Sequence, residues 1–272
     1  MSGTGTAYAE LQLIAVMARC QARGMAKFDD LVAEGVRTPV DGWDFSWFAG
    51  RATEERPPWG YARLIGERMA GAGRALDLQT GGGEVLAGIP KPPPVLVATE
   101  GWPPNAALAR DRLAPLGGVV VEVGEDDDLP FDDGAFDLVV SRHPVTVHWD
   151  EVARVLAPGG TYLSQQVGPG SVRELTDFMM GPQPVGMGRA PALARQNATA
   201  AGLAVRDLRT AGLRMEFFDV AAVIVFLRKV IWIVPGFTVP AYLDRLRALH
   251  DRIEQSGPFV AHSQRFLIEA GK

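Results

Sequence analysis

Apolar and polar positions follow two different periods along this chain. Residues 8–23 place Leu11, Ile14, Ala15 and Ala18 three and four positions apart, which predicts a helix with one buried face. From Arg74 to Val167, short apolar runs alternate with amphipathic stretches, and this pattern predicts a parallel, doubly wound α/β sheet. Ligands of such sheets bind at the carboxyl ends of the strands. We therefore expect the functional residues where the apolar runs end.

Four apolar runs in this region end in polar residues. The first contains Asp77 and leads into a glycine-rich turn, and the second runs from Pro94 to Glu100. The third, at 118–123, precedes an acidic run at 125–128, and the fourth ends near Ser141. Further strands are predicted at 203–208 and 265–270, and a helix at 171–180. Residues 181–191 contain too much Gly and Pro for regular structure.

Composition bounds the class of protein. The chain has 272 residues, of which 47% are hydrophobic and 22% charged, which suits one sizeable α/β domain with an appendage. Its net charge of −5 argues against non-specific binding of nucleic acid. The single cysteine, Cys20, allows neither an intramolecular disulfide nor a zinc-binding cysteine cluster, and no metal is expected.

The most apolar segment, Val220 to Val234, is too short to span a membrane and is interrupted by Arg228 and Lys229. It is better interpreted as a buried helix followed by a turn. The first residues lack the basic and apolar regions of a secretory signal, so we expect a cytoplasmic protein that does not bind membranes.

The turn after Asp77 excludes two phosphate-binding motifs. A dinucleotide fingerprint needs a third glycine where this chain has Leu86, and a phosphate loop needs a lysine that the turn lacks. A carboxylate beside the turn repels phosphate and attracts an ammonium group, with a Coulomb energy of roughly a few kcal/mol near a protein surface. The pattern therefore predicts a cationic group on the ligand.

The stretch from Asp77 to Gly83 resembles the first motif of class I S-adenosylmethionine-dependent methyltransferases, an acidic residue followed by G-x-G-x-G. The matching positions are Asp77, Gln79, Gly81 and Gly83, with Gln79 in place of the first glycine. Residues 133–139 and 151–160 also resemble the family patterns D-G-x-F-D-x-V and E-x-x-R-V-L-x-P-G-G. The resemblance is strong from Trp59 to Val167 and looser up to Lys272.

The resemblance implies a site for S-adenosylmethionine. Asp77 would hold the methionine ammonium group, the backbone of Gly81 and Gly83 would lie near the methionine portion, and Ser141 would lie at the cofactor edge. The acid at Glu125 would accept from the adenine amino group, and the backbone of Asp126 would reach a ring nitrogen. Glu100 lies 23 positions after Asp77, which is the usual position of the acid that binds ribose hydroxyls in nucleotide-binding βαβ units.

Methyl transfer needs a base only if the acceptor must lose a proton, and histidine is the usual choice. His143 and His148 follow the fourth strand and are the candidate catalytic residues. The alternative is that each is structural and hydrogen-bonded to the backbone. Arg142 either binds an acidic substrate or pairs with the turn at 132–133, and the sequence does not choose between these.

The predicted architecture is a Rossmann-like, mostly parallel sheet of seven strands, with an antiparallel last strand and an N-terminal helical cap. Residues 1–58 would form the cap and residues 59–272 the cofactor-binding domain, with an insertion at the substrate mouth around 169–200. The cap contains Trp43, Phe45, Trp47 and Phe48, which act as a lid over the site, as an anchor to the core, or as both.

Three functions fit the sequence. The leading hypothesis is a methyltransferase that acts on an O, N or C atom of a small molecule. The second is methylation of RNA or protein, and the RNA version would require a basic stripe that the acidic composition disfavours. The third is a non-catalytic module that binds S-adenosylmethionine, which the substitution at Gln79 keeps open. The sequence gives neither the acceptor nor the oligomeric state.

Overall fold

The structure is a computed structural model that describes residues 28–40 and 42–272. The helix predicted at 8–23 and Cys20 lie outside the described residues.

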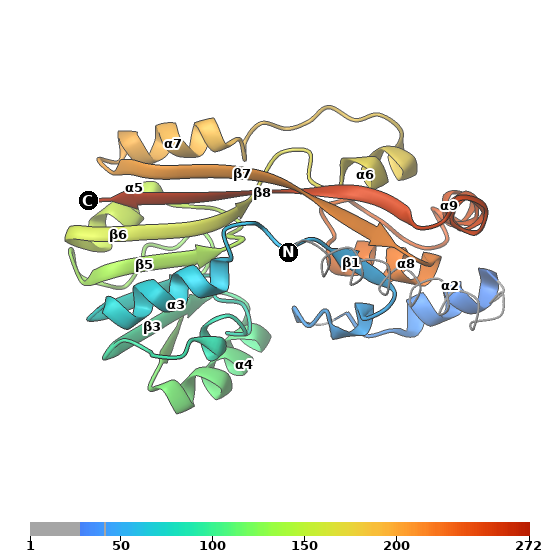
Figure 1. The fold of residues 1–272 in the computed structure, drawn as a ribbon. Helices are drawn as coiled ribbons and strands as arrows, with labels where there is room; N and C mark the ends of the chain where they lie inside the picture. The colour runs from blue at the N-terminus through green and yellow to red at the C-terminus, as the bar shows by residue number, and fades with distance from the viewer. Residues whose placement is uncertain (1–27, 41) are drawn as a thin grey trace, which may run out of the picture.

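One sheet runs through the described part of the chain, with the strand order β1-β7-β8-β6-β5-β2-β3-β4 (Figure 1). Its parallel region comprises β2 (Arg74–Leu78), β3 (Val95–Glu100), β4 (Val119–Glu122), β5 (Phe136–Arg142) and β6 (Leu156–Val167). The strand β8 (Phe259–Gly271) is antiparallel to both β6 and β7 (Ala204–Phe217). The predicted mostly parallel α/β sheet with an antiparallel last strand is therefore confirmed.

An additional short strand, β1 (Ala52–Glu54), pairs antiparallel with the end of β7. It brings the sheet to eight strands among the described residues, one more than predicted. Its three residues, Ala-Thr-Glu, carry no apolar pattern, and β1 is defined by its pairing with residues 215–217. A strand of this kind has no signal in its own sequence.

Helices cover both faces of the parallel region. The helices α3 (Tyr61–Gly71) and α4 (Pro103–Leu113) contribute to the apolar core on one face, and α5 (Trp149–Val155) and α7 (Pro191–Ala200) contribute to the core on the other face. Short 3-10 turns occupy Ser46–Phe48, Leu86–Gly88 and Ala114–Leu116. Alternate residues of β5 enter opposite cores: Leu138 and Val140 pack with α3, and Val139 packs with α5 and α7.

The strands β7 and β8 continue past the parallel region into a second core. Their antiparallel pairing runs from Ala204 opposite Gly271 to Phe217 opposite Phe259, with one register irregularity between Val205 and Asp207. Around their far halves lie α2 (Phe28–Arg37), α6 (Arg173–Met180), α8 (Val220–Lys229) and α9 (Leu243–Ser256), as Figure 1 shows. We call this apolar cluster, which includes Phe28, Leu175, Phe217, Val223 and Leu246, the second core.

The helix α8 lies at the centre of the second core. Residues 220–227 are all buried, and the Asp219 side chain caps the helix by accepting from the Ala222 N–H at 2.8 Å. A helix that is apolar on all sides is normally buried, so the interpretation of the segment from Val220 as a buried helix is confirmed. None of the described helices is long and apolar enough to cross a membrane.

The carboxyl ends of β5 and β6 point toward the second core (Figure 1). The predicted functional residues therefore lie between the parallel region and the second core. The described part of the predicted cap, from Phe28 onward, packs with α8 in the second core. The division at residue 58 remains a prediction.

Candidate functional site

Asp77 is a buried carboxylate without a cationic partner. It lies at the end of β2 and is 6% exposed, and within the described residues no Lys, Arg or His forms an ion pair with it. Burial raises the pKa of Asp77 to about 7, and the charge of Glu100 acts in the same direction. An unpaired buried charge is costly, so a cationic ligand group here would stabilise the ionised form.

The glycine turn is shaped by positive φ angles and by Glu100. Gly81 and Gly83 have φ angles of +65° and +78°, and a Cβ atom on Gly83 would lie 3.3 Å from the Cα of Ala109 in α4. The Glu100 carboxylate accepts from the Gly81 N–H at 2.8 Å and from the Trp102 N–H at 2.9 Å. Glu100 therefore fixes the turn that follows Asp77.

Gln79 ties the glycine turn to the loop after β5. Its backbone has a φ of +55°, the left-handed conformation that glycine adopts most easily. Its side-chain Nε2 donates to the Thr146 carbonyl at 2.7 Å, and its Oε1 accepts from the Val145 N–H at 2.7 Å. The sequence identified Gln79 only as a departure from the motif, and it contained no sign of this bridge.

The acidic loop after β4 is bound to the same segment. The Glu125 carboxylate accepts from the Thr146 hydroxyl at 2.9 Å, and the Glu125 carbonyl accepts from Nε2 of His148 at 2.7 Å. His148 therefore carries its ring hydrogen on Nε2, while Asp126 is exposed. The structure thus brings together Gln79, Glu125 and His148 around residues 144–148.

A hydrogen-bond chain fixes the tautomer of His143. The indole N–H of Trp59 donates to Oε1 of Gln165 at 2.8 Å, so Nε2 of Gln165 faces Nε2 of His143, 3.0 Å away. Because the amide nitrogen can only donate, Nε2 of His143 accepts, and its ring hydrogen lies on Nδ1. Burial, together with the charges of three arginines, holds the pKa of His143 well below its usual value, and the ring is neutral.

Ser141 lies beneath the strand end. Its side chain is fully buried, and its hydroxyl lies 2.8 Å from both the Tyr162 and the Ser164 hydroxyls. Its carbonyl accepts from the Tyr61 hydroxyl at 2.7 Å. The polar groups of its side chain and carbonyl are therefore already engaged inside the protein.

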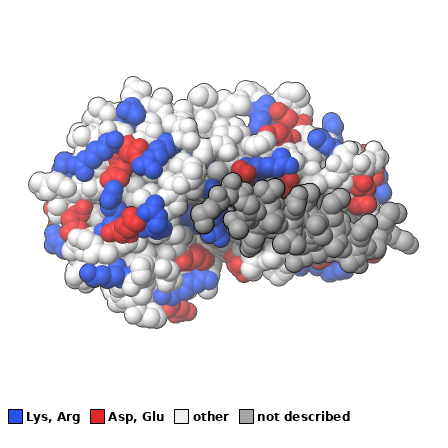
Figure 2. Space-filling model, viewed as in Figure 1, with Lys and Arg blue, Asp and Glu red and all other residues white. Residues whose placement is uncertain are grey.

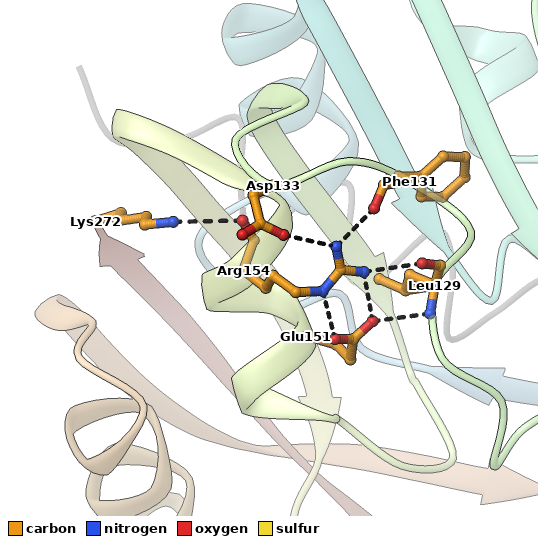
Figure 3. Close-up of polar contacts among 6 residues, drawn as sticks. All are labelled: Leu129, Phe131, Asp133, Glu151, Arg154 and Lys272. Atoms are coloured by element: carbon orange, nitrogen blue, oxygen red, sulfur yellow. Dashed lines mark hydrogen bonds and ion pairs between the residues drawn. The ribbon is translucent and has the colours of Figure 1, made fainter.

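Arg154 holds the loop that follows the acidic run, as Figure 3 shows. Its guanidinium donates to the carbonyls of Leu129 and Phe131 at 2.8 and 2.6 Å, and it pairs with Glu151 and Asp133 at 2.6 and 3.1 Å. Glu151 also accepts from the Leu129 N–H at 2.8 Å. These contacts explain the paired Glu and Arg of the E-x-x-R pattern, and they give Asp133 a partner other than Arg142.

A cavity of about 330 Å³ lies beside the end of β5 and β6. The loop 144–147 forms one wall, and residues 188–190 of the predicted insertion form another. Trp149, Leu193 and Phe266 give it apolar surfaces. The cavity therefore borders both the loop that Gln79 fixes and the insertion.

Aromatic residues from the segment 43–48 reach the glycine turn. A Cβ atom on Gly81 would lie 3.4 Å from Cδ1 of Trp43, and the Trp43 ring packs against Trp232 with centroids 5.9 Å apart. Phe48 is buried in the second core. Phe48 thus anchors the segment in the second core, while Trp43 lies against the glycine turn, and whether the segment acts as a lid stays a prediction.

Comparisons with known proteins agree with this geometry. Residues 76–164 match the family model of the methyltransferase domain. This part of the chain is therefore a methyltransferase domain. The protein is therefore an S-adenosylmethionine-dependent methyltransferase, as the motifs predicted, and S-adenosylmethionine is its cofactor.

Solved structures with the same fold come from several bacteria. The YcgJ protein of Bacillus subtilis is 17% identical with a TM-score of 0.56, over 78% of this chain and 97% of that chain. A protein of Deinococcus radiodurans is 16% identical with a TM-score of 0.56, over 80% and 90% of the two chains. A proposed methyltransferase of Bacillus halodurans is 16% identical with a TM-score of 0.53, over 78% and 99%. No curated protein sequence matches this methyltransferase.

The Gln79 bridge predicts different effects for two substitutions. Gln79→Ala and Gln79→Gly both remove the two hydrogen bonds to residues 145 and 146, which are worth about 1 kcal/mol each. Glycine also relieves the left-handed backbone, by roughly 1 kcal/mol. We expect both variants to transfer methyl groups more slowly and the alanine variant to be the less stable, as measured by urea unfolding. Equal stability of the two variants would contradict the backbone argument.

Proposed function

We propose that this methyltransferase transfers a methyl group to an O, N or C atom of a small-molecule acceptor that binds in the cavity beside β5 and β6. The cavity carries the proposal, because its volume of about 330 Å³ is in the range of small-ligand sites. It borders residues 144–147, which Gln79 and Glu125 hold next to the glycine turn. Arg189, in the predicted insertion around 169–200, forms part of its wall.

The described residues fit the cofactor. Asp77 offers a buried carboxylate without a cation, which suits the methionine ammonium group, and the turn through Gly81 and Gly83 allows close backbone approach. We assign the ribose hydroxyls to Glu100, and the adenine to Glu125 and the backbone of Asp126. Trp43, which reaches Gly81, would cover the methionine portion. The cofactor supplies an activated methyl group on its sulfonium.

The protein's contribution is then mainly orientation. Holding acceptor and donor in line can lower the activation barrier by up to roughly 7–11 kcal/mol. The bridge from Gln79 and the contacts of Glu125 fix the loop between the two binding regions. His143 takes no proton at Nε2, because that lone pair already accepts from Gln165. His148 retains a lone pair on Nδ1 and is the remaining candidate base for acceptors that must lose a proton.

Charge favours a small acceptor over RNA. Basic and acidic side chains are interspersed on the face shown in Figure 2, without a continuous basic stripe among the residues drawn in colour. The net charge of −5 has the same implication. Non-specific attraction to a polyanion requires clustered Lys and Arg.

Calorimetric titration tests the cofactor site. We expect saturable binding of S-adenosylmethionine that Glu100→Gln weakens about 10- to 100-fold, because the amide would face the Gly81 or Trp102 N–H and would lose one acceptor. Glu122→Gln, at the exposed end of the neighbouring strand, is the matched control and should bind normally. Equal affinity of all three proteins would contradict the assignment.

Transfer of a labelled methyl group tests the acceptor class. Cofactor binding with transfer to small molecules, and not to RNA or protein, is the expected result. Transfer to a macromolecule alone would contradict the proposal.

A further inference from the structure

Arg142 is a cation without a partner at the carboxyl end of β5. It is the last residue of the strand, is exposed, and makes no hydrogen bond or ion pair within the described residues. Asp133, which the sequence offered as its partner, pairs with Arg154 at 3.1 Å. The contacts in the described part of the chain therefore give Arg142 no structural role.

The strand register places Arg142 on the same face of the sheet as Asp77. In the parallel pairing of β2 with β5, Asp77 lies opposite Val140, which belongs to the core beneath α3. Arg142 is two residues after Val140, and alternate residues of a strand point to the same face. Two steps along one strand and one step across to the next separate the Cα atoms of Arg142 and Asp77 by roughly 8 Å. An acid and a base thus lie on one face at the ends of adjacent strands.

The side chains on either side of Arg142 are engaged elsewhere. Gln165 lies directly opposite it on β6, and the Gln165 amide accepts from Trp59 at 2.8 Å and donates to His143 at 3.0 Å. On the other side, Gln79 follows the end of β2, and its side chain bonds residues 145 and 146. Neither neighbour offers the guanidinium group an acceptor.

Arg142 and Asp77 form no ion pair with each other. Burial raises the pKa of Asp77 to about 7, and the charge of Arg142 only partly opposes that rise. Another arginine on this face, Arg265 of β8, already pairs with Glu54 at 2.8 Å. The opposite charges of Asp77 and Arg142 are therefore separated on one face, and a ligand that carries both charges can lie between them.

An α-amino acid group has this distribution of charge. Its ammonium and its carboxylate are attached to the same carbon atom, so each can meet the opposite charge when an acid and a base lie a short distance apart. A guanidinium group binds a carboxylate as a planar fork, with two charge-assisted hydrogen bonds. The methionine portion of S-adenosylmethionine carries such an amino acid group.

We propose that Arg142 binds the carboxylate of the cofactor's methionine portion while Asp77 binds its ammonium group. This inference rests on the proposed function, which assigns the ammonium group to Asp77, and it adds a binding residue from the neighbouring strand. The two residues together would make the intact amino acid group a requirement for tight binding. A nucleoside without that group would bind more weakly.

Three ligands separate the two charges. S-adenosylhomocysteine carries both the ammonium and the carboxylate, its decarboxylated analogue keeps only the ammonium, and methylthioadenosine lacks both. Titration calorimetry would measure each ligand with the wild type, Arg142→Gln, Arg142→Lys and Asp77→Asn. Arg245→Gln on α9 is the control, because Arg245 is exposed and lies in a helix of the second core.

Arg142→Gln should weaken binding of S-adenosylhomocysteine roughly tenfold or more, the effect of losing charge-assisted hydrogen bonds, and Arg142→Lys should weaken it less. Affinity of both variants for the decarboxylated analogue should stay within about twofold of the wild type. Asp77→Asn should weaken binding of both ligands that carry the ammonium group. Methylthioadenosine should bind equally to all variants, which also shows that each is folded, and Arg245→Gln should match the wild type throughout.

Two results overturn the inference. One is an affinity of Arg142→Gln for S-adenosylhomocysteine equal to that of the wild type. The other is an equal loss of affinity for S-adenosylhomocysteine and for its decarboxylated analogue, because the effect of Arg142 would then not depend on the carboxylate. Failure of the wild type to bind S-adenosylhomocysteine refutes the cofactor site of the proposed function instead.

Discussion

Asp77→Asn should weaken S-adenosylmethionine binding by roughly 10- to 100-fold near pH 7.5, the cost of losing a charged hydrogen bond. The substitution should also abolish the pH dependence of S-adenosylmethionine binding that we expect for the wild type. With the pKa of Asp77 at about 7 in the free protein, only a minor fraction is ionised at pH 6. Wild-type affinity should therefore rise about five- to tenfold from pH 6 to 7.5, until the cofactor's amino group loses its proton near pH 8. Titration calorimetry at both pH values measures this, and a wild-type affinity that does not change with pH would refute the ammonium assignment.

The same substitution should stabilise the unliganded protein above pH 7. Because folding raises the pKa of Asp77 from 3.8 to about 7, its contribution to stability is fully present below pH 4 and is lost as the pH rises through 7. At pH 8 the buried charge lowers the free energy of unfolding by up to about 4 kcal/mol, and Asp77→Asn removes this destabilisation. Urea unfolding at pH 5 and pH 8 should show a larger gain at pH 8. Asp251→Asn, on an exposed position of α9, is the control and should give no gain.

Arg154→Met should destabilise the protein by about 2–3 kcal/mol. The guanidinium bonds two carbonyls and the Asp133 carboxylate in the loop 129–133, and it pairs with Glu151 on its own helix (Figure 3). The substitution removes these contacts and leaves Glu151 without its charged partner. Arg154→Lys should be destabilised less than Arg154→Met, because lysine keeps the positive charge. It should still be less stable than the wild type, because lysine cannot form the same planar fork. We also expect weaker cofactor binding, since residues 129–131 continue from the loop that carries Glu125.

The matched control for Arg154 is Arg173→Met. Arg173 forms one partly exposed ion pair with Asp177 on the same helix, at 2.6 Å, so its loss should cost less than about 1 kcal/mol. Denaturant unfolding of the three variants gives the comparison. A similar loss for Arg154→Met and Arg173→Met would show that the contacts of Arg154 with residues 129–133 contribute no additional stability.

The parallel region was predictable because its signals are local. The strands β3, β4 and β5 contain short apolar runs, V-L-V-A, V-V-V and L-V-V, and the positions of Asp77 and Glu100 near strand ends follow from local patterns of this kind. The buried helix α8 was equally clear from its composition. For β7 the sequence contained more than the prediction used, since Leu213, Met215 and Phe217 alternate with Arg214 and Glu216 as in a half-buried strand.

The arrangement within the site depends on contacts between distant residues. Trp59 and Gln165 are 106 positions apart, and neither position carries a pattern that predicts their hydrogen bond or its effect on His143. The bridge from Gln79 to residues 145 and 146 is of the same kind. Ser141 was correctly placed near the end of β5, but whether its side chain faces the site or the core depends on the strand's register with β6, which the sequence does not contain.

The two long strands that join the cores also limit how the protein can open. A hinge between the parallel region and the second core would have to bend β7 and β8 together, across a ladder that stays paired from one core into the other. Clamshell rotation of the kind seen when two domains share only a linker is therefore disfavoured in this architecture. Access to the strand ends is left to segments outside the sheet, such as the one that places Trp43 against the glycine turn and the one that places residues 188–190 at the cavity. Exchange of substrate and product would then proceed by local rearrangement of these segments around a rigid frame.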